Sequence, residues 1–171
     1  FIVDCPAIHS FSGIAEAFSR NIGYSGGARN NLYRPVFELA NTADYVMGGG
    51  RPLLFHITNI LLQSACAILV LFLIYIVSGN ILVSFASALL FAIHPIQTES
   101  VTYISGRADP LYTSFVLLTL IFFSLFVKFK KSVFFYVVSL ATLCLALLSK
   151  ESAVIAPFLA LLYAFTIIPK E

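Results

Sequence analysis

Long apolar runs separated by short polar breaks fill the chain after a polar first third. Residues 1–51 carry mixed charges, whereas residues 52–171 hold five blocks of mostly Leu, Ile, Val, Phe and Ala. The blocks show no two-residue alternation, so they predict helices rather than strands. A helix of about 20 residues crosses about 30 Å of hydrocarbon. We therefore predict an all-α, polytopic integral membrane protein with an extracytoplasmic loop at residues 1–51 and a helical bundle at 52–171. The expected spans are 52–77, 81–94, 111–127, 133–148 and 153–168.

The polar first third is expected to form two short helices. Ser12 is a suitable cap for a helix from about Ile14 to Arg20, and the Gly- and Asn-rich residues 21–31 indicate a loop. A second helix should begin at Pro35, where a missing N–H costs nothing, and end at the glycines 48–50.

That second helix is predicted to be amphipathic and to lie at the membrane surface. Its expected acidic positions, Glu38 and Asp44, point away from the apolar face. The apolar face comprises Val36, Leu39, Ala40, Ala43 and Met47.

Composition supports lipid as the solvent for most of the chain. Hydrophobic residues make up 60% and charged residues 11%, against roughly half and a quarter in soluble domains. The net charge of +2 is too small to indicate nucleic acid as a partner. The three cysteines have no metal-type spacing, and the sequence has no Walker-type phosphate loop, nucleotide-binding glycine fingerprint or zinc-protease motif.

Basic residues set the expected orientation. Lys128, Lys130 and Lys131 lie between the third and fourth spans without an acid among them, so the positive-inside rule places that loop in the cytoplasm. Residues 1–51, 94–110 and 149–151 then share the opposite, extracytoplasmic face. The residues brought together there are Arg34, His56, His94, Glu99, Arg107, Asp109, Lys150 and Glu151.

Ionisable and amide groups close to the spans are functional candidates because they are expensive to bury in lipid. His56, Asn59 and Gln63 share one helical face that should point into the bundle. Interhelical hydrogen bonding and ligand contact are equally weighted explanations for them. Lys150 and Glu151 follow the fourth span directly, and marking the membrane interface is their simplest role.

Residues 94–109 are the most informative stretch. A short helix over Gln97 to Ile104 would place Thr98, Val101 and Thr102 on one face and turn Glu99 toward Tyr103. Gly106 and Arg107 would break it and present the guanidinium above the third span. A planar guanidinium suits a phosphate. A structural role, with Glu99 or Asp109 as its ion partner, is slightly favoured by spacing alone.

Five motifs in order carry a family resemblance. They are Tyr33-Arg34-Pro35, His56-Ile57-Thr58-Asn59, the stretch from Phe91 to Val101 with His94-Pro95 and Thr98-Glu99, Gly106-Arg107-Ala108-Asp109, and Leu148-Ser149-Lys150-Glu151. Over nearly the whole chain, this set resembles the membrane region of transmembrane, tetratricopeptide-repeat-containing O-mannosyltransferases and their bacterial relatives; we expect a bacterial member. Those enzymes belong to the multi-span glycosyltransferases with the GT-C fold, which use lipid-phosphate-linked sugars.

The resemblance implies a transferase whose site opens to the extracytoplasmic side. An acidic pair in the first external loop is typical of the family; here Asp4 stands alone, followed by Cys5, and is the candidate catalytic base. Helical repeats often follow the membrane domain. The chain starts at Phe1 and stops just after an apolar run, so we expect an internal piece of a longer protein, with the acidic pair upstream.

The implied roles follow from charge. Arg34, Arg107 and Lys150 would hold the lipid phosphate, while the remaining candidates would line the pocket or orient those cations. The expected partners are a lipid-linked sugar donor, a protein or glycan acceptor, membrane lipids and further subunits; a divalent metal is allowed but not required. The pocket-lining candidates are His56, His94, Glu99, Asp109 and Glu151.

Two other functions remain open at this point. A degenerate, non-catalytic transferase subunit in a larger assembly would fit the missing acidic pair. A transporter would also gather charges, but it normally places ionisable groups near the middle of its spans. The central parts of these spans hold mostly Ser, Thr, Tyr and Cys.

Overall fold

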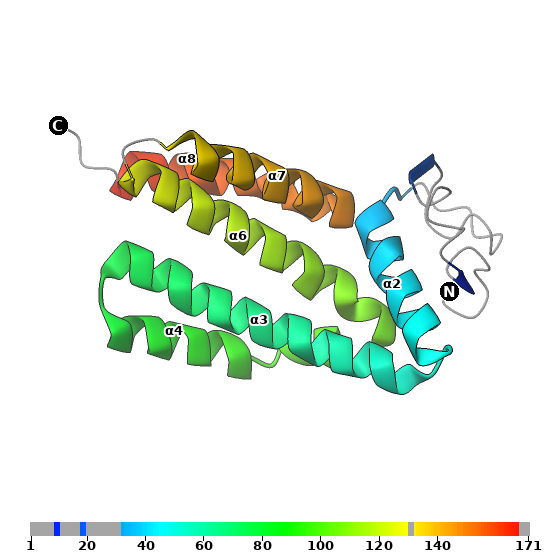
Figure 1. Cartoon of the computed structure of the whole chain (residues 1–171). Helices are drawn as coiled ribbons and strands as arrows, with labels where there is room; N and C mark the ends of the chain where they lie inside the picture. Colours follow the sequence, from blue (N-terminus) through cyan, green and yellow to red (C-terminus); the bar gives the residue numbers. More distant parts are fainter. Residues whose placement is uncertain (1–8, 11–17, 20–31, 130–131, 168–171) are drawn as a thin grey trace.

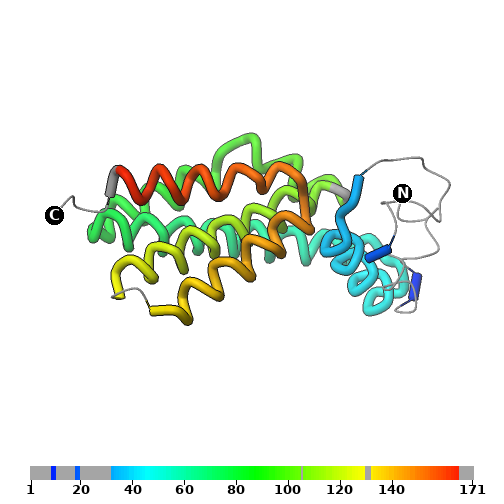
Figure 2. Tube along the Cα trace, turned by 90° about the horizontal axis from the view of Figure 1, so that it is seen from above, coloured from blue at the N-terminus to red at the C-terminus, as the bar shows by residue number. Residues whose placement is uncertain are grey.

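A computed structural model describes residues 9–10, 18–19, 32–129 and 132–167. Every regular element in these ranges is helical, which confirms the all-α class for that part of the chain. Most of the helix expected between Ile14 and Arg20, the loop at 21–31 and the candidate base Asp4 lie outside the described residues. Figures 1 and 2 show the long apolar helices lying roughly along one axis, with the helix Pro35–Gly48 packed across one end.

Helix α2 runs from Pro35 to Gly48, as the sequence predicts. Pro35 starts it, because proline has no N–H to leave unsatisfied in the first turn. Gly49 ends it in the left-handed region, with φ of 59°, and donates its N–H to the carbonyl of Tyr45.

The buried face of α2 differs from the expected one. Glu38 and Asp44 are 6% and 3% exposed, whereas Met47, which was assigned to the apolar face, is 69% exposed. The helix therefore buries these two acids beside Phe37, while Val36 and Ala40 of the predicted apolar face pack against the same core. The physical reason is a buried cation, described below, whose carboxylate partner is Asp44. Apolar periodicity cannot reveal such a partner.

Helices α3, Pro52–Ser78, and α4, Ile81–Ile93, form an antiparallel pair (Figure 1). Gly79 closes α3 with φ of 66°, and the Asn80 side chain caps α4 by accepting from the N–H groups of Leu82 and Val83. At 1.5 Å per residue, α3 is about 40 Å long and α4 about 20 Å. Therefore α4 covers only part of α3.

The rest of that side of α3 is covered by the polar stretch identified from sequence. It forms a short helix α5, Gln97–Thr102, and a 3-10 helix η4, Ile104–Arg107, both in contact with α3. The predicted helix over 97–104 is thus shorter than expected and changes type after Thr102.

Helices α6, Ala108–Lys128, and α7, Val133–Ser149, pack against each other along a line of buried hydroxyls. Ser139 donates to the carbonyl of Thr119 at 3.0 Å, and the Thr119 and Thr142 hydroxyls are 3.0 Å apart. Hydroxyl bonds of this kind join helices in lipid. The chain then continues through a 3-10 helix η5, Glu151–Ile155, into α8, Ala156–Ile167.

Two described helices, α3 and α6, are long and apolar enough to cross a membrane. The other apolar helices are shorter, so the five predicted crossings stay a prediction. Large apolar side chains nevertheless cover the outer surface: Leu82, Phe165 and Val133 are each more than 70% exposed. An apolar surface of this extent indicates a membrane protein.

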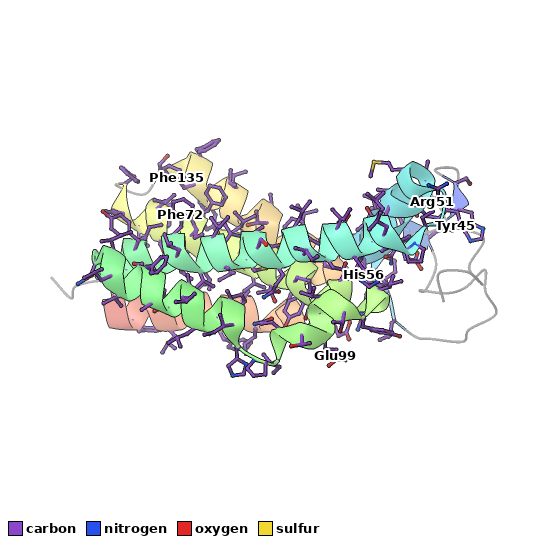
Figure 3. The ribbon with its side chains drawn as sticks, turned by 90° about the horizontal axis from the view of Figure 1, so that it is seen from below. Tyr45, Arg51, His56, Phe72, Glu99 and Phe135 are labelled. Carbon is purple, nitrogen blue, oxygen red and sulfur yellow. The ribbon has the colours of Figure 1, made fainter. Side chains whose placement is uncertain are left out.

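The two ends of the bundle differ in character. Figure 3 shows Tyr45, Arg51 and His56 toward one end, and Phe72 and Phe135 toward the other. We call the end with Tyr45, Arg51 and His56 the polar end. It also carries the two ion pairs described below, which join Arg34 to Glu151 and Lys150 to Asp109. The sequence placed these groups on one face, and the structure brings them to one end.

Candidate functional site

Arg107 is fully buried at the junction of α2, α3 and η4. Its Nη2 pairs with the carboxylate of Asp44, and its Nη1 donates to the carbonyl of Ala40 at 3.0 Å. Its Nε donates to Oδ1 of Asn59 at 3.3 Å, and the guanidinium lies 5.2 Å from the ring centre of Phe55. One side chain therefore joins three elements.

The acidic partner of Arg107 differs from the two that spacing suggested. The partner is Asp44 on α2, the helix predicted to lie at the membrane surface, and not Glu99 or Asp109. The second oxygen of Asp44 accepts from the Thr58 hydroxyl at 3.1 Å, so the carboxylate is held on both sides. These contacts favour the structural role for Arg107; phosphate binding by Arg107 stays a prediction.

The polar face of α3 holds α5 and η4 in place. Asn59 donates through Nδ2 to the carbonyl of Tyr103 at 3.2 Å, and Nδ1 of His56 lies 3.4 Å from the carbonyl of Val101. These are the interhelical hydrogen bonds that the spacing of this face allowed. Ligand contact by His56 stays a prediction.

Gly106 is needed where η4 crosses α5. A Cβ at this position would lie 2.8 Å from the carbonyl oxygen of Glu99 and 3.2 Å from Cα of Ser100. Both atoms belong to the backbone and cannot rotate away, so only glycine allows this approach. The glycine therefore allows η4 to pack directly against the backbone of α5.

Two ion pairs form a surface cluster at the polar end. Arg34 contacts both oxygens of Glu151, with Nε to Oε2 at 2.9 Å, and Lys150 pairs with Asp109. The Lys150 ammonium also lies 5.4 Å from the ring centre of Tyr112. Since Lys150 and Glu151 are consecutive, the end of α7 is tied both to α2 and to α6.

Charge in this cluster is unevenly exposed. The Arg34 side chain is 14% exposed and that of Lys150 22%, whereas the Asp109 and Glu151 side chains are about half exposed. Hydrogen bonds from Arg34 hold the pKa of Glu151 below its ordinary value. A backbone hydrogen bond to Glu151 and the positive charges of Arg34 and Lys150 lower the pKa further. Glu151 is thus a carboxylate at neutral pH.

The acids Glu99 and Asp109 face a common cavity of about 360 Å³. We call it the acidic cavity. Its hydroxyl-bearing residues and its two carboxylates could hold a polyol or an attacking hydroxyl. It is lined by Ile96, Gln97, Glu99, Ser100, Asp109, Tyr112 and Thr113.

A second cavity of about 280 Å³ lies on the other side of α5. We call it the Gln63 cavity. Thr98, Val101 and Thr102 lie on one helical face, as predicted, and that face lines it. Gln97 lines both cavities, so the two are neighbours. The remaining lining residues are Gln63, Ala92, Ile93 and His94.

His94 lies at the end of α4 and is exposed. Its Nδ1 accepts a hydrogen bond from the N–H of Ile96 at 3.2 Å, which tightens the turn through Pro95 into α5. Among the residues described, no group of three or more His, Cys, Asp and Glu side chains could hold a metal ion.

Several known proteins have sequences related to this chain. The chain is 34% identical to protein O-mannosyl-transferase TMTC4 of Homo sapiens, over 56% of this chain and 15% of that protein. It is 38% identical to protein O-mannosyl-transferase TMTC2 of Homo sapiens, over 52% and 11%. It is 29% identical to protein O-mannosyl-transferase F38B6.6 of Caenorhabditis elegans, over 70% and 18%.

The chain is similar to protein O-mannosyl-transferases. This supports the family resemblance seen in its motifs. These relatives come from animals, and they give no support to the expected bacterial source. The chain spans less than a fifth of the length of each of these relatives. No family model matches the chain, and no solved structure matches it.

The sequence alone did not point to two residues of this site, Asp44 and Tyr112. In the sequence, Asp44 is one acid among several, and Tyr112 is part of an apolar run. A buried arginine needs a carboxylate, and that requirement could have directed attention to the acids of α2. Tyr112 falls one helical turn after Asp109, and this spacing could have indicated its place in the cluster.

Proposed function

We propose that this chain is part of a membrane glycosyltransferase. It would move a sugar from a polyprenyl-phosphate donor to an acceptor hydroxyl on the extracytoplasmic face. The naming of its relatives as protein O-mannosyl-transferases supports this, and mannose is accordingly the sugar to test first. The observation that carries the proposal is the meeting of the Lys150–Asp109 pair and the acidic cavity at the polar end.

Lys150 is the proposed phosphate-binding group nearest to the acidic cavity, because both its carboxylate partner and its aromatic neighbour line that cavity. Arg34 is the second candidate, and its planar guanidinium suits two phosphate oxygens. A phosphate in this place would draw both cations partly away from Asp109 and Glu151. Negative charge growing on the leaving phosphate would be stabilised there.

The reaction needs a base for the acceptor hydroxyl. In the proposed step the acceptor oxygen bonds to the anomeric carbon, the bond from that carbon to the phosphate oxygen breaks, and the electron pair leaves with the phosphate. The proton passes to a carboxylate. Asp4 is the candidate base from the sequence, while Glu99 and Asp109 are the carboxylates that line a cavity and would orient the hydroxyl.

The proposed orientation follows from Lys128 at the opposite end and from the two lysines that come after it in the sequence. With Lys128 to Lys131 in the cytoplasm, the polar end lies outside, where a lipid-linked donor and a protein or glycan acceptor would meet. Arg107 acts through others in this proposal: it fixes η4, and thereby places Asp109 two residues further on.

The direct test is transfer of labelled mannose from polyprenyl-phosphate mannose by the full-length protein in proteoliposomes. We expect Lys150→Met to lower the rate on the order of a hundredfold, as loss of a charge-stabilising group does. Lys128→Met, at the opposite end, is the matched control and should keep the wild-type rate. Normal transfer by a folded Lys150→Met protein would contradict the site assignment.

A second candidate function is a non-catalytic subunit in a larger assembly. It is favoured by the pairing of both surface cations with carboxylates, because such pairs can serve purely to join helices. If the wild-type protein transfers no sugar from any polyprenyl-phosphate donor tried, this second function is supported instead.

A further inference from the structure

The Gln63 cavity contains an unsatisfied hydrogen-bond donor. Gln63 is 8% exposed, and its Nε2 atom is buried without a hydrogen-bond partner. Leaving a buried amide nitrogen unpaired is costly, and such groups are rare in folded proteins. The nitrogen belongs to a side chain that lines the cavity, so an acceptor atom placed there would satisfy it.

The chemistry of the cavity walls limits what that acceptor can belong to. None of the lining residues is Asp, Glu, Lys or Arg, so the walls offer no fixed counter-charge for a phosphate or an ammonium group. They offer amides from Gln63 and Gln97, hydroxyls from Thr98 and Thr102, and the imidazole of His94. The apolar surfaces of Ile93 and Val101 lie among these polar groups. A sugar ring matches this mixture, because it carries neutral hydroxyls on an apolar carbon frame.

The Gln63 cavity also adjoins the place of the proposed reaction. Gln97 lines this cavity and the acidic cavity alike, and the acidic cavity holds the carboxylate of Asp109 with Lys150 bound to it. A ring in the Gln63 cavity would therefore lie next to the acidic cavity, whose residue Asp109 pairs with Lys150.

We propose that the Gln63 cavity binds the neutral hydroxylated ring of the donor sugar, with Nε2 of Gln63 donating a hydrogen bond to one of its oxygens. This rests on the proposed function, and it adds the residues that recognise the sugar as distinct from its lipid phosphate. Gln97 and Thr98 supply further hydrogen bonds, and Val101 packs against the carbon frame of the ring.

The test compares two lipids that differ only in the sugar. Binding of short-chain polyprenyl-phosphate mannose and of the same polyprenyl phosphate without mannose is measured by calorimetry on the full-length protein in micelles. Gln63→Leu should weaken binding of the mannose lipid by roughly three- to tenfold, the worth of one hydrogen bond, and change binding of the bare phosphate lipid less than about twofold.

Ser64→Ala is the matched control on the same helix. Its hydroxyl is exposed and donates to the carbonyl of Ile60 at 2.8 Å, so its loss should leave both affinities unchanged. Gln63→Leu should also fold, since it removes an amide nitrogen that has no partner to lose. Its thermal midpoint, measured alongside, should not fall below that of the wild type.

Each of the following results would overturn the inference. If Gln63→Leu weakens the binding of both lipids equally, the cavity contacts the polyprenyl phosphate that they share. If Gln63→Leu changes neither affinity, the sugar ring does not bind in the cavity. If the Gln63→Leu protein binds the mannose lipid normally while Lys150→Met still abolishes transfer, this inference alone fails. If wild-type protein binds neither lipid, the proposed function fails with it.

Discussion

Arg107 is a charge buried between apolar helices and bound on several sides by the protein itself. Asp44 neutralises it, while Asn59 and the carbonyl of Ala40 accept its remaining hydrogen bonds. Removing one member of a buried ion pair leaves the other uncompensated, which costs far more than losing a pair at the surface. Asp44 and Asp109 allow this difference to be measured within one protein, since both pair with a cation.

We expect Asp44→Asn to lower the free energy of unfolding by about 3–5 kcal/mol. Asp109→Asn, the same change at a half-exposed carboxylate, should lower it by less than about 1 kcal/mol. Equilibrium unfolding in mixed micelles, followed by circular dichroism, measures both. Equal losses for the two variants would mean that burial does not set the strength of these pairs.

Gly106→Ala is predicted to be destabilising for steric reasons. The added methyl group would meet the Glu99 carbonyl at 2.8 Å, so η4 must move away from α5, at a cost of about 1–3 kcal/mol. Gly48→Ala is the comparison, because the three atoms nearest to a Cβ there belong to the Leu54 side chain, at 3.1 Å or more, and not to the backbone. The thermal midpoints in micelles compare the two, and a midpoint for Gly106→Ala as high as that for Gly48→Ala would refute the close approach.

At the scale of elements, the helices were largely predictable and their docking was not. The apolar blocks gave α3 and α7 to within a residue at each end, because block length and flanking Pro, Gly and Asn mark helix ends directly. The 3.6-residue period likewise predicted the face of α5 that lines the Gln63 cavity. The packing of α2 depends on Asp44 meeting Arg107, and no local pattern contains a contact between segments so far apart.

The joint between α2 and η5 should depend on pH. The pKa of Glu151, which lies outside the apolar runs, is lowered in the folded protein by its hydrogen bonds from Arg34. A lowered pKa means that the stabilisation is present above the unfolded-state value of about 4.3 and is lost as pH falls through the folded value. We expect the thermal midpoint of the wild type to fall more steeply than that of Glu151→Gln below about pH 4.3.

Salt provides the control for this joint. Glu151 is exposed, so high ionic strength should reduce the difference between the wild type and Glu151→Gln at neutral pH. Parallel midpoints from pH 3 to pH 7 would show that the ion pair does not hold α2 to η5.

At the scale of the whole molecule, the polar end with its ion pairs lies opposite the end that carries Lys128. Lys128 closes α6 at one end, and Lys150 pairs with Asp109 near the start of the same helix at the other. Since α6 is about 31 Å long at 1.5 Å per residue, a membrane of ordinary thickness fits between them. This leads to a direct prediction of topology.

Single cysteines placed at the two ends should react from opposite sides of the membrane. In a variant lacking Cys5, Cys66 and Cys144, we expect Arg51→Cys to react with an impermeant thiol reagent added to intact cells. Phe129→Cys, which is also exposed, should react only after permeabilisation. Reaction of both from outside would contradict the proposed orientation.

The ion pair between Asp44 and Arg107 also bears on the order of assembly during synthesis. The two residues are 63 positions apart, so at about 5–20 residues per second the carboxylate is made roughly 3–13 s before its partner is made. A carboxylate without a counter-ion is too costly to bury in the meantime. Helix α2 must therefore wait in water or among lipid headgroups, and the bundle closes over it only when η4 arrives.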